Sequence, residues 1–308
     1  TRESYGNALV ELGGEHENLV VLDADLAAAT KTGMFKKAFP DRHIDCGIAE
    51  ANMTGVAAGM STCGFVPFVS TFAMFAAGRS YEQVRNSIGY PHLNVKIGAT
   101  HAGITVGEDG ATHQCNEDIA LMRTIPGMTI INPADETEAK KAVRAALEID
   151  GPVYMRFGRL AVPVIYDEAS YKMEIGRGIK MADGSDVTII ATGITVAMAL
   201  EARATLAAEG IDAAVVNIHT IKPLDRELVI AEARKTGAIV TAEEHNIIGG
   251  LGEAVCAATA EAYPVPVLRV GIEDRFGRSG KVPPLLEMYG ITPANIAAKA
   301  REAVKLKK

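Results

Sequence analysis

Short runs rich in β-branched and other apolar residues alternate along this chain with longer stretches whose apolar residues recur at helical spacing. This alternation is typical of α/β domains built on a parallel sheet. In the first half, the short runs predict strands at Leu19–Leu22, His43–Cys46, Phe65–Val69, Val95–Ala99, Thr129–Asn132 and Val153–Phe157. The longer stretches predict helices at Glu3–Leu12, Ala49–Thr62, Phe72–Tyr90, Glu117–Arg123 and Thr137–Glu148.

A stretch with several glycines breaks this rhythm between about residues 160 and 186, as a linker or a small hairpin would. The alternation then resumes, with strands predicted at Val187–Ala191, Ala213–Ile218, Ala238–Thr241 and Pro266–Val270 and helices at Thr195–Ala208, Arg226–Lys235 and Glu253–Ala262. The sequence therefore predicts a two-domain α/β protein. The first domain covers residues 1–165, the linker covers 166–185, and a smaller α/β domain covers 186–308.

The composition narrows the choice of partners and compartment. The 308 residues are 48% apolar, and no apolar run reaches the roughly 20 residues that span a bilayer, so we expect no membrane segment. A net charge of −7, with Lys and Arg scattered along the chain, is unfavourable for contact with a phosphate backbone, so we expect no nucleic acid partner. Four widely spaced cysteines without a C-x-x-C pair indicate a reduced protein, and we expect a cytoplasmic location.

Gly249, Gly250 and Gly252 lie between a predicted strand and a predicted helix, where dinucleotide-binding folds have a phosphate-binding turn. Their spacing is not G-x-G-x-x-G, and the sequence contains no G-x-x-x-x-G-K-[ST]. We therefore interpret these glycines as a tight strand-to-helix turn.

Glu50 falls where a predicted strand gives way to a helix, and its neighbours are mostly small or apolar, so its carboxyl could be buried. From the residues alone, the better explanation is structural, with Glu50 as a helix cap or as the partner of a nearby cation. Phe72 and Phe75, three residues apart, fit core packing on one helix face.

His101, Asp109 and His113 lie in a glycine-rich segment after the predicted strand Val95–Ala99. Parallel α/β sheets place binding loops at the carboxyl ends of their strands, so this position favours a binding function. The same three side chains could also ligate zinc or iron, although their spacing matches no established metal motif.

Two motifs resemble those of transketolases, a family of thiamine diphosphate enzymes. One is G-I-A-E-A-N-M at residues 47–53, and the other is the T-H…G-E-D-G-x-T-H-Q pattern of residues 100–114. Residues 243–246 and 275–280 also look like the family's C-terminal domain. The resemblance extends over nearly the whole chain and implies a pyrimidine-binding domain followed by a transketolase C-terminal domain.

The resemblance implies a cofactor site in the first domain. Glu50 would be catalytic, because the corresponding glutamate activates the cofactor through a hydrogen bond to its pyrimidine ring. Phe72 and Phe75 would contact the aminopyrimidine with their flat apolar faces. Asp25 and Leu26 match an Asp-Leu pair that abuts the cofactor across a subunit boundary.

The resemblance also implies a sugar phosphate site. Arg2, His101 and Arg156 would bind the substrate phosphate, for which guanidinium groups are well suited. Asp109 would hydrogen-bond a sugar hydroxyl. His113 would contact the donor ketose near its reacting carbons and is the second residue to which we assign a catalytic role.

The chain departs from the family pattern at several positions. Gly78 stands where a third aromatic residue is usual, and Ala29 stands near a serine of the phosphate site, with Thr30 beside it as a possible substitute. Ala102 and Ala111 replace a common aspartate and a usual proline.

The G-D-G…N segment that holds the metal and the diphosphate in this family does not occur in these residues. The resemblance therefore implies a split transketolase, in which this C-terminal subunit forms an α2β2 assembly with an N-terminal transketolase subunit. That partner would hold Mg²⁺ or Ca²⁺ through oxygen ligands. The reaction would move a two-carbon ketol unit between phosphorylated sugars. The alternatives are the corresponding half of a deoxyxylulose-phosphate-synthase-like enzyme and a non-catalytic assembly subunit.

Overall fold

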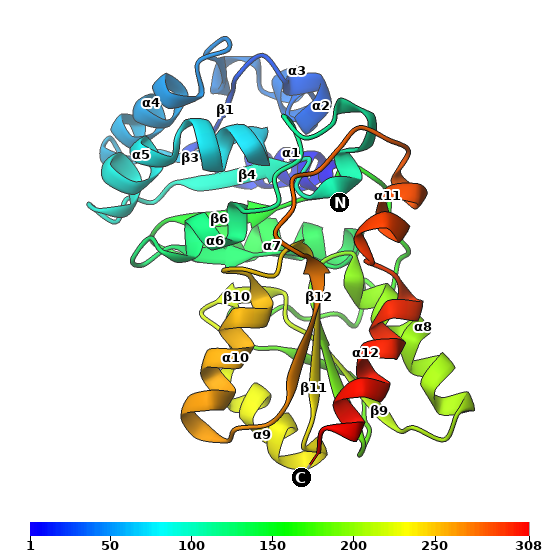
Figure 1. Cartoon of the computed structure of the whole chain (residues 1–308). Coiled ribbons are helices and arrows are strands. Elements are labelled where there is room, and N and C mark those ends of the chain that lie inside the picture. The colour runs from blue at the N-terminus through cyan, green and yellow to red at the C-terminus, as the bar shows by residue number, and fades with distance from the viewer. Residues whose placement is uncertain (308) are drawn as a thin grey trace.

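A computed structural model describes residues 1–307. The chain forms two separate, mainly parallel sheets, which lie one above the other in Figure 1. Helices cover both faces of each sheet, because every strand is flanked by apolar side chains that must be buried. The predicted fold class, a two-domain α/β protein with parallel sheets, is confirmed.

The first sheet has seven strands in the order β10-β5-β6-β4-β3-β1-β2. Their bounds are β1 Leu19–Asp23, β2 His43–Asp45, β3 Val66–Phe72, β4 Lys96–Thr100, β5 Thr129–Ile131, β6 Val153–Arg156 and β10 Thr220–Lys222. All pairs are parallel except the one between β10 and β5. Because β10 comes from the second half of the chain, the two halves are joined through a shared sheet edge, which the alternation of elements did not predict.

Helices α1 (Arg2–Glu15), α3 (Gly33–Ala38) and α7 (Glu136–Glu148) pack on one face of this sheet around Leu9 and Phe68. Helices α4 (Glu50–Thr62) and α6 (Asp118–Arg123) cover the other face. The short helix α2 (Ala27–Thr30) follows β1. This arrangement leaves the carboxyl edge of the parallel strands open for loops.

The second sheet has five strands in the order β12-β11-β8-β9-β7. Their bounds are β7 Ile179–Ala182, β8 Val187–Ala191, β9 Ala213–Asn217, β11 Ile239–Asn246 and β12 Val267–Ile272. Its helices are α8 Thr195–Ala208, α9 Arg226–Thr236, α10 Leu251–Ala262, α11 Val282–Tyr289 and α12 Pro293–Lys305. β7 lies within the stretch expected to be a linker, and it pairs antiparallel with β9.

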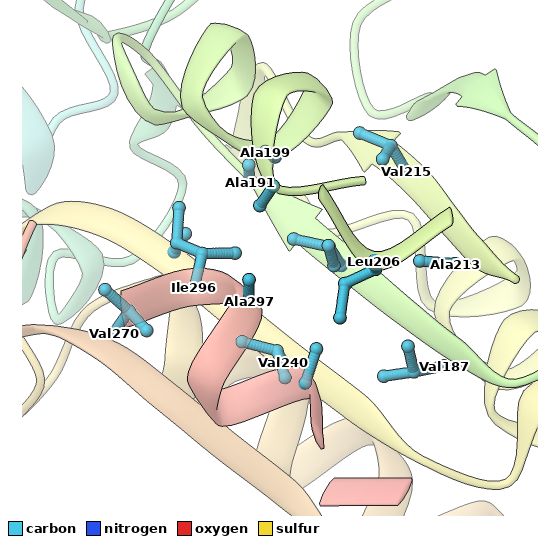
Figure 2. Close-up of a cluster of buried hydrophobic side chains, with 14 of the residues drawn as sticks. Val187, Ala191, Ala199, Leu206, Ala213, Val215, Val240, Val270, Ile296 and Ala297 are labelled. Carbon is cyan, nitrogen blue, oxygen red and sulfur yellow. The ribbon is translucent and has the colours of Figure 1, made fainter. Parts of the chain in front are cut away.

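The core of the second domain lies between its sheet and helices α8 and α12. Figure 2 shows Leu206 from α8 and Ile296 from α12 among the strand residues Val187, Val215 and Val240, all of which are buried. Helices α9 and α10 bury Val229 and Val255 against the opposite face. No helix within residues 1–307 is long and apolar enough to cross a bilayer.

The predicted helix Phe72–Tyr90 differs from the structure. β3 continues to Phe72, because Thr71 and Phe72 pair with Ala99 and Thr100 of β4. Helical turns then run from Phe75 to Gly89, with π-helical turns η2 (Phe75–Arg79) and η3 (Val84–Gly89) on either side of α5 (Tyr81–Gln83). Such turns often occur at functional sites, and η2 carries two residues of the site described below.

In the glycine-rich turn before α10, a side chain of the protein bonds two of the backbone amides at the start of the helix. The Glu243 carboxylate accepts hydrogen bonds from the backbone N–H groups of Leu251 and Gly252, at 2.7 and 2.8 Å. A side chain of the protein itself therefore caps this helix, in keeping with a structural turn.

Candidate active site

The predicted site residues cluster at the carboxyl edge of the first sheet. Glu50 begins the helix after β2, Phe72 ends β3, and His101 follows β4. Arg2 reaches the same edge because α1 begins there, as shown by its hydrogen bond to Ala29 O, just after β1. This edge is where open parallel sheets bind ligands.

Glu50 is the first residue of α4, and its side chain is only 1% exposed. Arg79 Nη1 lies 2.9 Å from both carboxylate oxygens of Glu50, so the cation that we considered for this residue is present. The Arg79 guanidinium also lies over the Phe75 ring, 4.3 Å from its centre. The positive end of α4 and the Arg79 guanidinium both lie beside the Glu50 carboxyl group.

Next to this ion pair lies a group of packed rings, here called the aromatic surface, which consists of Phe72, Phe75, His101 and His113. Phe72 and Phe75 lie nearly parallel, with ring centres 5.9 Å apart. Phe72 stacks on the His101 ring at 3.8 Å, and His113 meets Phe75 edge-on at 5.4 Å. Phe75 is partly exposed and, together with Arg79, lines a cavity of about 560 Å³. The histidines and the aromatic residues therefore form one continuous surface.

Gly78 makes room for a neighbouring side chain. A Cβ atom at residue 78 would lie 2.2 Å from Cε of Met74, which also lines the cavity. A methionine thus fills part of the space that the usual aromatic residue would take.

The aromatic surface lies next to a group of positively charged side chains, here called the cationic end, which consists of Arg2, Lys31 and Arg159. Arg2 Nη1 lies 2.7 Å from Ala29 O and 3.5 Å from His101 Nε2. Burial and the nearby charge of Arg159 both lower the pKa of Arg2. Arg2, Lys31 and Arg159 line a second cavity of about 390 Å³. This arrangement places several positive groups where a phosphate could lie.

His101 is buried, and burial together with the charges of Arg2 and Arg159 lowers its pKa to about 3. Since Arg2 can only donate, the Nε2 atom of His101 accepts from it, which leaves the proton on Nδ1 beside the Thr100 hydroxyl at 2.9 Å. In this state His101 is neutral.

The expectation that Arg156 binds phosphate does not fit its surroundings. Its side chain is 3% exposed and forms an ion pair with Asp118 at 2.9 Å, while Nη2 donates to Glu244 O at 2.8 Å. Arg159, three residues later, is partly exposed and lies close to Arg2. The sequence R-F-G-R at residues 156–159 contains both arginines, and only Arg159 lies beyond the end of β6. This position was the feature of the sequence that could have identified Arg159.

The Asp25-Leu26 pair follows β1 at the same edge. Asp25 is exposed, has a φ of +60°, and donates its N–H to Asp45 at 3.0 Å. Thr30, considered as a substitute for the serine of the phosphate site, is buried and donates its hydroxyl to Asp23 at 2.8 Å. Thr30 is therefore unavailable to a ligand.

The segment after β4 carries the remaining predicted residues. Asp109 ends the 3₁₀ turn η4 (Ile104–Asp109) and is exposed, whereas His113 is partly exposed, with Nδ1 2.9 Å from the Thr112 hydroxyl. Within residues 1–307, no group of three or more His, Cys, Asp or Glu side chains could hold a metal ion. The structure therefore does not bring His101, Asp109 and His113 together as a group that could hold zinc or iron.

Comparison with known proteins adds to this geometry. Residues 1–164 match the transketolase pyrimidine-binding domain, and residues 176–296 match the transketolase C-terminal domain. The putative transketolase C-terminal section of Methanocaldococcus jannaschii is 50% identical over 306 residues, 99% of this chain and 96% of that protein. The 1-deoxy-D-xylulose-5-phosphate synthase 1 of Geobacter sulfurreducens is 40% identical over 96% of this chain, which corresponds to 46% of that longer protein.

A solved structure described as a split gene transketolase, inactive beta4 tetramer, is 53% identical and superimposes with a TM-score of 0.92. The superposition covers 100% of this chain and 98% of that one. The chain matches both transketolase domains, and it is 50% identical to a relative along nearly the whole length of both proteins. The chain therefore belongs to the transketolase family.

Proposed function

We propose that the protein is the C-terminal subunit of a split transketolase that uses thiamine diphosphate to transfer a two-carbon ketol unit from a ketose phosphate to an aldose phosphate. The observation that carries this proposal is the stacking of His101 on Phe72 at 3.8 Å. This contact joins the aromatic surface beside Glu50 to the cationic end at Arg2. A flat cofactor ring and a phosphorylated sugar could therefore lie next to each other.

The residues around Glu50 fit an aminopyrimidine ring. Phe75 offers a partly exposed ring face, and the buried Glu50 carboxyl would hold a proton at a ring nitrogen. Gln114 and Asn116 line the same cavity, and their buried side-chain oxygens have no hydrogen-bond partner in the described chain, so they could accept from an amino group if the side chains turn toward it. When bound, thiamine diphosphate supplies the nucleophilic carbon that takes up the two-carbon unit.

The other end of the site would recognise the sugar phosphate. Arg2 and Arg159 would bind the phosphate through charge-assisted hydrogen bonds, with His101 beside them. Asp109 would accept a hydrogen bond from a sugar hydroxyl. His113, edge-on to Phe75, would lie near the reacting carbons.

The proposal includes an N-terminal transketolase subunit that holds the diphosphate and Mg²⁺ or Ca²⁺, in an α2β2 assembly. The names of the M. jannaschii relative and of the split-gene structure support a divided enzyme. Apolar surface near the site also supports a partner, since Ile48 is 75% exposed and Val56, on α4, is 37% exposed. Exposed apolar groups beside a site commonly mark an interface.

The test measures ketol transfer from xylulose 5-phosphate to ribose 5-phosphate with thiamine diphosphate and Mg²⁺. The chain alone is compared with the chain mixed with its N-terminal subunit. Activity only in the mixture supports the proposal, whereas activity in the chain alone contradicts the division of the site. An inactive but verified complex would favour the alternatives, a deoxyxylulose-phosphate-synthase-like enzyme or a non-catalytic assembly subunit, and the first of these is tested with that synthase's own substrates.

A further inference from the structure

We propose that Glu244 in the second domain is a positioning residue for the segment of residues 101–114, here called the recognition segment. This segment carries Asp109 and His113, and the proposal rests on the function proposed for them. It gives the second domain a part in substrate recognition, although that domain contributes none of the residues assigned above.

The recognition segment has little stiffness of its own. Gly103, Gly107 and Gly110 have φ angles of +77°, +83° and +76°, within eight residues. Glycines adopt such angles readily, but they also leave the backbone free to adopt others. Contacts from outside the segment must therefore hold Asp109 and His113 in one place.

Glu244 provides one of these contacts at the start of η4. Its side chain is buried, and Oε1 accepts a hydrogen bond from the backbone N–H of Thr105 at 2.7 Å. The N–H groups of a first helical turn lack partners within the turn, so this carboxylate caps it. A Cβ atom at residue 103 would lie 2.2 Å from the same oxygen, so only glycine lets the carboxylate approach this closely.

The first domain in turn holds Glu244. Arg156, paired with Asp118, donates from Nη2 to the backbone oxygen of Glu244 at 2.8 Å. This contact fixes the end of β11 against β6. The burial of Arg156 therefore has a structural purpose, which is to place the Glu244 carboxylate beneath the recognition segment.

The second domain touches the recognition segment at further points. Ser279 Oγ donates to Glu108 O at 2.6 Å, and Gln114 Nε2 donates to Arg278 O at 3.0 Å. The side chain of Ile104 packs with a buried cluster from the second domain that consists of Ile272, Leu285, Tyr289 and Ile291. Figure 1 shows α11, which carries two of these residues, beside the first domain. Among these contacts, Glu244 supplies the buried ionisable side chain, and burial raises its pKa to about 7.

Two variants separate positioning from general stability. Glu244→Gln keeps the volume and an acceptor oxygen for the Thr105 N–H, whereas Glu244→Ala removes the acceptor. Val240→Ala is the matched control, because Val240 lies on the same strand four residues before Glu244, is fully buried and belongs to the core drawn in Figure 2. Truncation at Val240 costs stability without touching the segment.

The first readout is hydrogen exchange of peptides that cover residues 104–110 in the isolated chain. We expect exchange about tenfold faster in Glu244→Ala and unchanged in Glu244→Gln and Val240→Ala, because only the first loses the bond to Thr105. The second readout is kcat/KM for xylulose 5-phosphate in the assembly. Small misplacements of binding groups are costly, so we expect a loss of about tenfold or more in Glu244→Ala and a loss within about threefold in Glu244→Gln.

Three results would overturn the proposal. The first is Glu244→Ala activity within about twofold of wild type, and the second is an equal loss in Glu244→Gln. The third is an equal loss in Val240→Ala. If the wild-type assembly neither turns over nor binds ribose 5-phosphate in calorimetry, the proposed function itself has failed, and the role of Glu244 fails with it.

Discussion

Arg79 donates from one guanidinium nitrogen to both carboxylate oxygens of Glu50, at 2.9 Å, while its guanidinium lies over the Phe75 ring. Arg79 is half exposed and Glu50 is buried, so the arginine covers the carboxylate from the solvent side. The ion pair explains how a buried carboxylate is tolerated here, because a nearby cation offsets its lost hydration.

Glu50→Gln tests the proton-holding role of the carboxyl. The amide keeps the volume of Glu50 and an oxygen for Arg79, but it cannot share a proton with a cofactor nitrogen. We expect turnover of the assembly to fall by about two orders of magnitude or more, the usual size of an acid–base contribution, with little change in the thermal unfolding midpoint. The control is Glu82→Gln, on the exposed face of α5. Wild-type turnover in Glu50→Gln would exclude the proposed role.

Arg159→Ala tests the cationic end. A hydrogen bond to a charged group contributes about 1.5–3 kcal/mol, so KM for xylulose 5-phosphate should rise by about tenfold or more. KM for xylulose without its phosphate should rise less, because that sugar loses no phosphate contact and is affected only through the bonds of Arg159 to Val106 O and Glu108. Lys36→Ala, on the exposed part of α3, is the control. An equal rise in KM for both sugars would show that Arg159 does not act on the phosphate.

Arg156 should behave differently from Arg159, because its partner Asp118 is fully buried. Arg156→Met keeps much of the volume but leaves the Asp118 carboxylate with only the Tyr154 hydroxyl as a side-chain partner. Breaking a buried ion pair costs about 3–5 kcal/mol, so the denaturation midpoint should fall clearly. Arg159→Ala should leave that midpoint nearly unchanged. A stable Arg156→Met variant with a raised KM would return the phosphate-binding role to Arg156.

These two arginines show what the sequence could and could not predict. The strand Val153–Phe157 followed from local apolar residues, and the glutamate and histidine motifs followed from short, contiguous patterns. Which arginine is buried depends on Asp118 and Glu244, which lie 38 and 88 residues from Arg156 along the chain. Pattern reasoning contains no such distant contacts. For the same reason it missed β10, whose partner β5 precedes it by about ninety residues.

The pH dependence of His101 follows from its surroundings. Its pKa is lowered to about 3 by burial and by Arg2 and Arg159, so the folded protein keeps it neutral while an unfolded chain takes up a proton below about pH 6.5. Because only the unfolded chain takes up this proton, the free energy of unfolding falls as the pH decreases from about 6.5 toward 3. In NMR titrations its ring should show no protonation above about pH 5.

Changes at the cationic end that make it less positive should raise the pKa of His101. Arg159→Ala removes one of the positive charges, and added inorganic phosphate brings negative charge, so each should raise the pKa of His101. A His101 midpoint near the ordinary histidine pKa of about 6.5 in the wild type would contradict the described environment.

Glu138 on α7 joins the two domains through the stretch between them. Its carboxylate accepts from Ala134 N at 2.6 Å, from the Tyr171 hydroxyl, and from Nδ2 of Asn217 on β9 at 2.9 and 3.1 Å. The Ala134 N–H and the Asn217 NH₂ can only donate, and together they reach both oxygens of residue 138, so both oxygens must accept. Glu138→Gln would turn an NH₂ group toward donors and leave buried groups unpaired, at a cost of about 1–3 kcal/mol. The urea midpoint should fall, whereas Glu136→Gln, exposed on the same helix, should change it little. An unchanged midpoint in Glu138→Gln would mean that this buried cluster does not hold the domains together.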